Sequence, residues 1–271
     1  MLSIITAIHN QIEVNRLFVA NLQRFTHFPF ELIVVDNDSK DGSGNFFRSA
    51  GATVIQNDGN YSYPHCQNQG LQIARFDVLA FLNNDIIVSP GWDQRLLAVM
   101  NHQGLEVASC CGVERLESKN ITRYYRKKWS AIRNILGWFG YGTRNLQLMH
   151  RMMYGNWERS TRDRWAKFGC SVREGFVGST VVMKRSALEK IGRWDERIYA
   201  ADFDLYLRSK ARSLERGDIR PVHVALGVFN HHYIRMTLRS PRPGFKDQAK
   251  LISLHAKWGK EHVAKYIKGL E

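Results

Sequence analysis

The chain has 271 residues, 44% of them hydrophobic and 24% charged, a composition typical of a globular protein with a sizeable core. No run approaches 18 apolar residues and the start, MLSIITAIHN, lacks a basic region and a cleavage site, so we expect neither a transmembrane helix nor a signal peptide. The four cysteines show no metal-binding spacing, and we expect them to be reduced in a cytoplasmic protein.

The positive charge of the chain is unevenly distributed. There are 39 Lys and Arg against 25 Asp and Glu, a formal net charge of +14. Residues 115–173 alone hold 14 Lys and Arg and three acidic residues. Such a segment suits phosphate-rich partners, among them nucleotides, nucleic acids and anionic membrane surfaces.

The first third of the chain alternates short apolar runs with amphipathic stretches. Strands are predicted at 2–8, 31–36, 52–57 and 77–85, and helices at about 12–26, 43–50 and 65–75. This alternation predicts an α/β fold with a mostly parallel sheet flanked by helices. In such sheets ligands bind beyond the carboxyl ends of the strands.

Residues 114–173 interrupt the alternation. They are basic and aromatic, with four of the seven Trp, and we interpret them as an insertion or lid. Regular patterning then returns with a strand at STVVMKR, helices at SALEKIG and DFDLYLRSKAR, and a strand at VALGVFNHH. Apolar residues at near-helical spacing after 244 predict a C-terminal helix.

Polar side chains close each predicted strand of the first third. They are His9-Asn10, Asp36-Asn37-Asp38, Asn57-Asp58 and Asn83-Asn84-Asp85. Because the carboxyl ends of parallel strands share one edge, we expect these side chains to form a site, which Asn57, Asn60 and Asn68 would also reach. The alternative is a set of ordinary turns and helix caps.

The motif FLNND delivers one carboxylate, Asp85, to this edge. One carboxylate is enough for Mg²⁺ or Mn²⁺ if the ligand brings a diphosphate; otherwise Asp85 caps a turn. Further along, Asp202 and Asp204 diverge on one helix, so Asp202 could face a cleft while Asp204 pairs with Arg208. The two histidines of FNHHY are either metal ligands or structural.

These motifs, in this order, resemble the GT-A glycosyltransferases of family 2, in particular the rhamnosyl- and galactosyltransferase-like branch of bacterial surface polysaccharide synthesis. The similar stretches are SIITAIHN, LIVVDNDSKDGS, NYSYPHCQNQGL, FLNNDIIVSPGW, VGSTVVMKRSALEKIGRWDERIYAADFDLYLR and the HH pair. They cover residues 2–113 and 174–237.

The resemblance implies a Rossmann-like GT-A fold and an inverting transfer of a sugar from a nucleoside diphosphate to an acceptor hydroxyl. Asp202 would be the general base, and Asp85 would hold Mn²⁺ or Mg²⁺ with His231 or His232. The donor would be bound by Ala7, His9, Asp36, Asp38, Asn60, Asn68, Asn83 and Asn84. Residues 1–113 would form the nucleotide-sugar half, 174–240 the acceptor half, 114–173 the insertion and 241–271 a helical tail.

Two positions depart from the family pattern. Asn83 replaces the first carboxylate of the D-x-D motif, which bears on metal dependence, and Ala201 replaces the Glu of the Glu-Asp pair. A catalytically silent relative is therefore one alternative. A sugar nucleotidyltransferase is another, although the start of the chain lacks the Gly-rich, basic loop that such enzymes use for a triphosphate.

The resemblance also implies the partners. The donor would be a UDP-, dTDP- or GDP-sugar, and the acceptor a saccharide or a lipid-linked saccharide. The segment 115–173 would form the acceptor wall or lie on an anionic membrane surface at the inner face of the membrane, unless it is only a solvated cationic face. A nucleic-acid-binding protein would explain the charge but not the polar strand ends, and we expect no nucleic acid partner.

Overall fold

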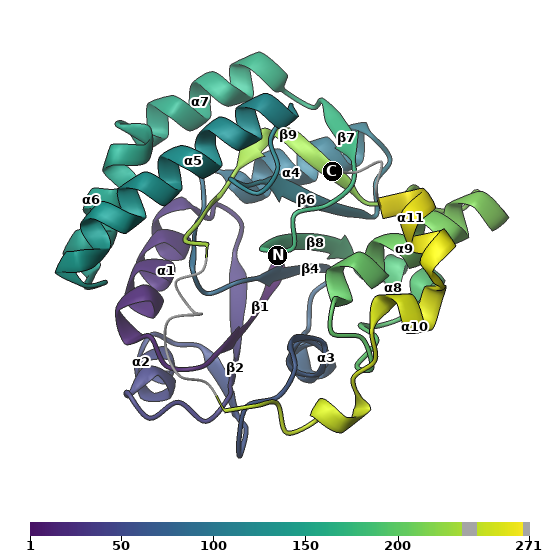
Figure 1. The fold of residues 1–271 in the computed structure, drawn as a ribbon, viewed down its shortest axis with the longest axis horizontal. Helices are drawn as coiled ribbons and strands as arrows, with labels where there is room; N and C mark the ends of the chain where they lie inside the picture. The colour runs from purple at the N-terminus through teal and green to yellow at the C-terminus, as the bar shows by residue number, and fades with distance from the viewer. Residues whose placement is uncertain (235–242, 268–271) are drawn as a thin grey trace.

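The computed structural model describes residues 1–234 and 243–267 and shows a mixed sheet with helices on both faces (Figure 1). The sheet has eight strands in the order β3-β2-β1-β4-β8-β6-β9-β7. Its strands are β1 Leu2–Ile8, β2 Phe30–Asp36, β3 Thr53–Gln56, β4 Val78–Leu82, β6 Val107–Cys111, β7 Val172–Glu174, β8 Thr180–Lys184 and β9 His223–Phe229. Two further short strands, β5 Ile86–Ile87 and β10 His231–His232, pair antiparallel.

The α-helices of the described chain alternate with the strands up to β6 and then come in groups, α5–α7, α8–α9 and α10–α11. They are α1 Ile12–Phe25, α2 Ser43–Ser49, α3 Tyr63–Ile73, α4 Trp92–His102, α5 Lys119–Leu136, α6 Thr143–Tyr154, α7 Trp157–Phe168, α8 Arg185–Ile191, α9 Ala201–Arg216, α10 Leu254–Trp258 and α11 Lys260–Ile267. None of the helices described here combines the length and apolar character that a bilayer span requires. The four cysteines are free thiols, as expected.

The direction of the strands gathers their polar ends at one edge of the sheet. β1 runs parallel to β2 and β4, and β6 runs parallel to β9. β8 is antiparallel to β4 and β6, with Leu82 opposite Thr180, so β8 begins where β4 ends. β3 is parallel to β2, so the carboxyl ends of six strands and the start of β8 share an edge, and the predicted mostly parallel α/β sheet is confirmed.

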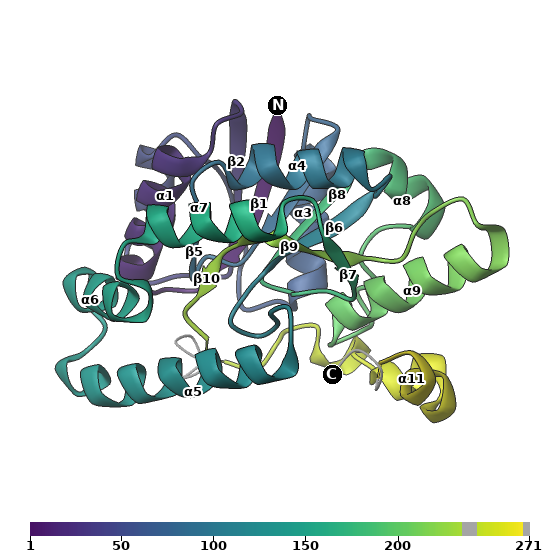
Figure 2. The same cartoon turned by 90° about the horizontal axis from the view of Figure 1, so that it is seen from above.

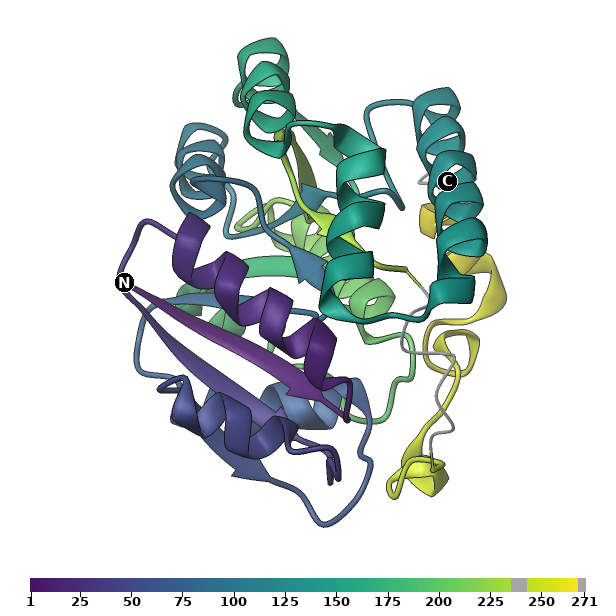
Figure 3. The ribbon, with the colours of Figure 1, turned by 90° about the vertical axis from the view of Figure 1, so that its left-hand side faces the viewer.

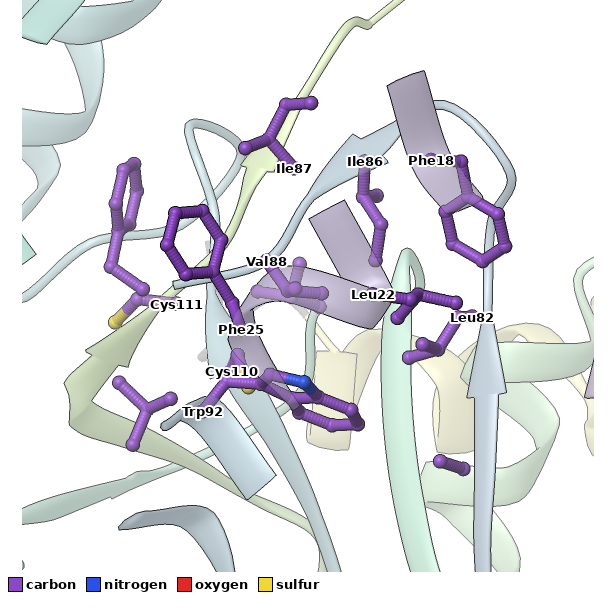
Figure 4. Packing of buried hydrophobic residues seen from close by; sticks show 14 of the residues in the cluster. Phe18, Leu22, Phe25, Leu82, Ile86, Ile87, Val88, Trp92, Cys110 and Cys111 are labelled. Carbon is purple, nitrogen blue, oxygen red and sulfur yellow. The ribbon is translucent and has the colours of Figure 1, made fainter. Parts of the chain in front are cut away.

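Two apolar cores hold the layers together. On one face, α1, α4 and the helices α5–α7 pack against side chains such as Ile4 and Val34. Figure 4 shows part of this core, where Phe25 of α1 lies near Val88 and Trp92, and Phe18 of the same helix lies near Ile86. On the other face, α3, α8 and α9 cover Ile5 and its neighbours. Strands that are buried on both faces read as continuous apolar runs, which explains why the sequence predicted them.

The segment 114–173, which we interpreted as an insertion or lid, is mostly helical. Trp129 of α5 and Trp157 of α7 are buried and anchor two of its helices, whereas Trp138 is 89% exposed. α7 packs along β9, and α5 packs on α6. Figures 2 and 3 show α5 and the C-terminal helix α11 at the same end of the molecule, opposite the N-terminus.

The tail contains two short helices where the sequence predicted one helix. Ile252 forms a bridge with Ile198, so the chain is extended before α10. Gly259, with φ of 76°, separates α10 from α11, because a left-handed backbone conformation ends a helix. The predicted boundary at 240/241 lies outside the described residues.

Candidate active site

A cavity of about 1120 Å³ opens at the polar edge of the sheet. Its lining includes Tyr63 at the start of α3, Asn83 after β4, Glu114–Leu116 after β6, Arg173 of β7, Gly178–Ser179 before β8, Asp202 at the start of α9, His232 of β10, Ile267 of α11 and one face of α5. A cavity of this size is large enough for a small-molecule ligand of some hundreds of Å³ together with a second substrate.

Asp85 and His232 are in contact at this edge. The Asp85 side chain is buried, and its Oδ1 accepts a hydrogen bond from His232 Nε2 at 3.0 Å. The pairing of β5 with β10 sets this geometry, since His232 is opposite Ile86 and Tyr233 N–H donates to the Asp85 carbonyl at 2.9 Å. His232 Nδ1 meets the Glu114 carboxylate on its other side.

The His232 imidazole is therefore held between two carboxylates. Burial by itself would lower its pKa, but the negative charges of Asp85 and Glu114 raise the pKa well above its ordinary value. The second oxygen of Glu114, Oε2, is buried without a hydrogen-bond partner among the described residues. A divalent cation would have to displace a proton from this imidazolium before a ring nitrogen binds it, because a protonated nitrogen is not a metal ligand.

His231 points the opposite way, as neighbouring residues of a strand do. Its Nδ1 lies 2.8 Å from the Tyr154 hydroxyl, and its ring packs edge-on against Trp129 at 5.1 Å. Burial lowers the pKa of His231 well below its ordinary value, so the ring is neutral. Of the two candidate histidines, the structure brings His232 to Asp85.

Asp202 lies in the first turn of α9 and faces the cavity. Its Oδ1 accepts a hydrogen bond from the Phe203 N–H at 2.9 Å, and burial raises its pKa. Gly178 makes room for the carboxylate, because a Cβ at that position would lie 2.2 Å from Asp202 Oδ2. Asp204, as predicted, pairs with Arg208 at 2.8 Å instead.

The four candidates at the ends of β1 and β2 lie together. Ala7 is opposite Val35 in the β1–β2 register, and His9 Nδ1 lies 2.6 Å from the Asn37 carbonyl oxygen. Asp36 is buried and accepts a hydrogen bond from the Ser39 N–H at 2.9 Å. Asp38 is in the left-handed region, with φ of 62°, and forms an ion pair with Lys40. None of the four lines the cavity of Asp202.

The candidate amides are mostly engaged with the protein itself. Asn60 donates to the Pro243 carbonyl at 2.8 Å, and Asn84 donates to Asn15 Oδ1 at 2.7 Å. Asn68 donates to the Trp194 carbonyl and to Glu196. Buried amides need such partners, and these three fix loops around the site. Asn83 differs from them, because it lines the cavity.

Several residues that line the cavity were not predicted from the sequence. Glu114 follows the buried strand β6 and carries the same signal, a polar residue at a strand end, that pointed to Asp85. Arg115 and Tyr63 also line the cavity, and Tyr63 raises no expectation because it precedes the predicted helix 65–75, although α3 begins with it in the structure. No local pattern links Gly178 to Asp202, which follows 24 positions later.

The protein donors near Asp85 fit a divalent cation that a ligand completes. Within residues 1–234 and 243–267, no group of three His, Cys, Asp or Glu side chains could hold a metal by itself. Asp85 and His232 supply one carboxylate and one imidazole in contact, and Glu114 Oε2 lacks a partner. Hard cations with few protein ligands are typically completed by substrate phosphates and water.

A family model described as "Glycosyl transferase family 2" matches residues 3–192, so the chain belongs to this family. The match covers most of the sheet, from β1 to the end of α8. No curated protein sequence matches the chain.

Proteins from two organisms are among the solved structures with the same fold. A mannosyltransferase from Pyrobaculum calidifontis, PcManGT, in complex with GDP-Man and Mn²⁺, matches with a TM-score of 0.56 and 15% identity, over 98% of this chain and 64% of that one. S. aureus TarS 1–349 matches with a TM-score of 0.52 and 15% identity, over 85% of this chain and 60% of that one. The same TarS fragment was solved in complex with UDP.

These likenesses confirm the GT-A, Rossmann-like fold predicted from the sequence motifs. The chain spans less than two thirds of the length of the solved chains that it matches.

Proposed function

We propose that this protein is an inverting glycosyltransferase that moves a sugar from a nucleoside diphosphate to an acceptor hydroxyl. The observation that carries the proposal is that His232, which contacts Asp85, and Asp202 line one cavity. A transferase needs a place for the leaving diphosphate and a base for the acceptor, and it needs both beside one anomeric carbon. Family membership supports the same reaction.

In this proposal, Asp85 and His232 bind the metal, Mn²⁺ or Mg²⁺, that accompanies the donor diphosphate. The metal, when bound, neutralises negative charge on the departing nucleoside diphosphate. The unpartnered Glu114 oxygen and the contact between Asp85 and His232 support this assignment. His231 is proposed as a supporting residue behind β10, because its ring is enclosed by aromatic side chains.

Asp202 acts as the general base. It takes the proton of the acceptor hydroxyl, whose oxygen attacks the anomeric carbon while the bond from that carbon to the phosphate oxygen breaks and its electron pair leaves with the diphosphate. A single displacement inverts the configuration, through a transition state with oxocarbenium character. Burial raises the pKa of Asp202, which makes the carboxylate a better proton acceptor. Because position 201 is Ala, Asp202 is the one carboxylate of the Glu-Asp pair.

The donor nucleoside is assigned to the ends of β1 and β2. Asp36 and Asp38 would accept hydrogen bonds from the base or ribose, beside Ala7 and His9. Asn60, Asn68 and Asn84 would act through the loops that they hold, while Asn83 would face the diphosphate. Complexes of the structural neighbours with GDP-Man and with UDP support a GDP-, UDP- or dTDP-sugar as donor.

The acceptor is proposed to be a saccharide, free or lipid-linked, used in polysaccharide or glycoconjugate synthesis at the inner face of a membrane. The corner between α5 and α6 supports peripheral attachment. Trp138 is 89% and Phe139 80% exposed there, next to a helix rich in Lys and Arg. Exposed aromatic rings beside cations are typical of segments that lie in a membrane interface.

Thermal unfolding with UDP, GDP and dTDP, each with and without Mn²⁺, tests the proposal first. One nucleotide at 100 times its Kd should stabilise the protein by about 2.7 kcal/mol, and Mn²⁺ should increase the shift. Transfer from the matching nucleotide sugar should then invert the anomeric configuration. Stabilisation by no nucleoside diphosphate would contradict the proposal, whereas nucleotide binding without turnover would favour a catalytically silent relative.

A further inference from the structure

The cavity of Asp202 carries a positive charge that the proposed transfer step does not use. Six cationic side chains line it: Arg115, Lys119, Arg123, Arg126, Lys127 and Arg173. The carboxylates in the lining are those of Glu114 and Asp202, and Glu114 is engaged with His232. Among the described residues, none of the six cations has an ion-pair partner, although other cations of the chain do.

Four of these cations form a stripe on α5. Lys119, Arg123, Arg126 and Lys127 recur at the spacing of one helical face, and that face lines the cavity. The opposite side of α5 is buried through Trp129, whose Nε1 is 3.5 Å from the Ile234 carbonyl oxygen. The rotation of α5 is therefore fixed by Trp129, and its cations are presented to the cavity.

The other two cations are held deeper, by backbone carbonyl groups. Arg115 donates to the Glu174 carbonyl at 3.0 Å, and its Nε is buried without a partner. Its guanidinium lies against Gly175, where a Cβ would be 2.7 Å from three guanidinium atoms. Burial, and then the charge of Arg173, lowers the pKa of Arg115. Two guanidinium groups without a counter-ion are costly to enclose unless a ligand supplies the negative charge.

The donor diphosphate cannot account for all six cations of the cavity, which we call the cationic wall. Lys119 and Lys127 are eight residues apart on one helix, which separates them by about 12 Å along its axis, several times the spacing of two linked phosphorus atoms. The donor phosphates are already assigned to Asp85 and His232. The nucleoside residues at the ends of β1 and β2 lie outside this cavity. The wall therefore belongs to the side of the cavity that the acceptor enters.

We propose that the acceptor is a phosphate-bearing saccharide and that the α5 stripe, with Arg115 and Arg173, binds its phosphate while Asp202 meets its hydroxyl. The inference rests on the proposed function and names its acceptor class. Guanidinium groups match phosphate oxygens in two-point contacts, and lysines add charge along a chain. The phosphate could belong to a phosphodiester within a saccharide or to the diphosphate that links a saccharide to a lipid.

Equilibrium binding of a matched probe pair tests this directly. Octyl hexosides and their 6-phosphates are titrated into the full chain by calorimetry, with the nucleoside diphosphate and Mn²⁺ present to fill the donor site. The phosphorylated probe should bind at least tenfold more tightly than the neutral one, and added salt should weaken that preference.

A variant that removes two cations of α5 tests whether the cationic wall binds the phosphate. Arg123→Gln with Lys127→Gln should weaken binding of the 6-phosphate at least tenfold and leave the affinity for the neutral probe unchanged. Arg151→Gln with Arg162→Gln is the matched control, because both residues are exposed, lie outside the cavity and remove the same charge. All four positions are exposed, so both variants should keep the thermal midpoint of the parent chain.

A polyprenyl diphosphate hexoside in mixed micelles separates the two sources of phosphate. Tighter binding of this lipid than of the soluble 6-phosphate, lost in the charge variant, supports the proposal with a lipid-linked diphosphate, and the reverse order, lost in the same variant, supports it with a phosphate within the saccharide. Equal affinity for phosphorylated and neutral probes, no binding of any phosphorylated probe, or equal losses in the two variants would overturn it. Nucleotide binding and sugar transfer are measured separately, so failure here leaves the proposed function standing.

Discussion

The contact between Gly178 and Asp202 gives the sharpest test of the proposed base. In Gly178→Ala, the added Cβ would lie 2.2 Å from Asp202 Oδ2 and 3.1 Å from its Cγ. Ordinary contact begins near 3.4 Å, so the carboxylate must move by more than about 1 Å. Gly178 does not have positive φ, so the change adds crowding and no backbone strain.

A displacement of this size should lower the rate of sugar transfer and leave the binding of the donor unchanged. A misplacement of about 1 Å in a reacting group costs about 100-fold, which corresponds to about 2.7 kcal/mol in the barrier. We expect kcat for sugar transfer to fall by about that factor, with the KM for the donor within about twofold of wild type. Steady-state kinetics with the nucleotide sugar that gives the largest thermal shift is the assay.

Two further variants test whether the loss arises from the displacement of Asp202. Gly244→Ala introduces the same methyl group where no atom of the described residues lies within 4 Å, and its kcat should stay that of the parent. In a protein that already carries Asp202→Asn, Gly178→Ala should cause no additional loss, because both act on one group. A Gly178→Ala enzyme with the parent's kcat, or losses that add in the double variant, would refute the reasoning.

Four further predictions concern the base, the metal, an ion pair and the membrane. Asp202→Asn should lower transfer by about 1,000-fold and leave nucleotide binding intact, which thermal shift and kinetics measure together; an unimpaired variant would exclude Asp202 as the base. Asp85→Asn should remove the Mn²⁺-dependent part of the nucleotide-induced thermal shift, whereas His102→Gln, on the surface, should retain it. Arg197 and Lys257 hold the pKa of Asp195 below its ordinary value, so its contribution to stability is full above the unfolded pKa and is lost as the pH falls through the folded one. Asp195→Asn should therefore destabilise the protein by about 1.5 kcal/mol at pH 7 in denaturant unfolding, and the difference should shrink below about pH 4; exposed Asp163→Asn is the control, and a pH-independent difference would argue against the ion pair. Trp138→Ala with Phe139→Ala should reduce flotation with anionic vesicles at least tenfold. The control Leu214→Ala, which removes an apolar side chain that is 62% exposed on α9, should float like the parent protein. Equal flotation of the parent, the double variant and the control would exclude the corner between α5 and α6 as the membrane contact.

The sequence predicted the sheet well because its strands are buried on both faces. The run LSIITAI was predicted as a strand at 2–8, and it forms β1 over the same residues. The insertion was harder to interpret. α5 carries Tyr125, Trp129, Ile132 and Leu136 at helical spacing, so its pattern does indicate a helix, but we interpreted the segment from its charge and its aromatic content alone.

The candidate site was predictable as far as strand ends determine it. The polar ends of the parallel strands do share an edge, because chain direction alone brings them there. The choice between His231 and His232 depended on the register of β10 against β5, two residues each, which no local pattern specifies. Glu114 and Arg115 enter the cavity from a segment whose long-range contacts the sequence does not indicate.

Three glycines beside the cavity restrict the substitutions that the site can accept. Gly112, Gly175 and Gly178 each lie where a Cβ would collide with Glu114, Arg115 or Asp202, at 2.3, 2.7 and 2.2 Å. Saturation mutagenesis should therefore find these positions intolerant although none carries a reactive group. Gly112 and Gly178 should also tolerate a larger residue once the partner side chain is shortened, so homologous chains should vary the two positions of each of these pairs together, whereas Gly175, with φ of 127°, would stay strained with any side chain.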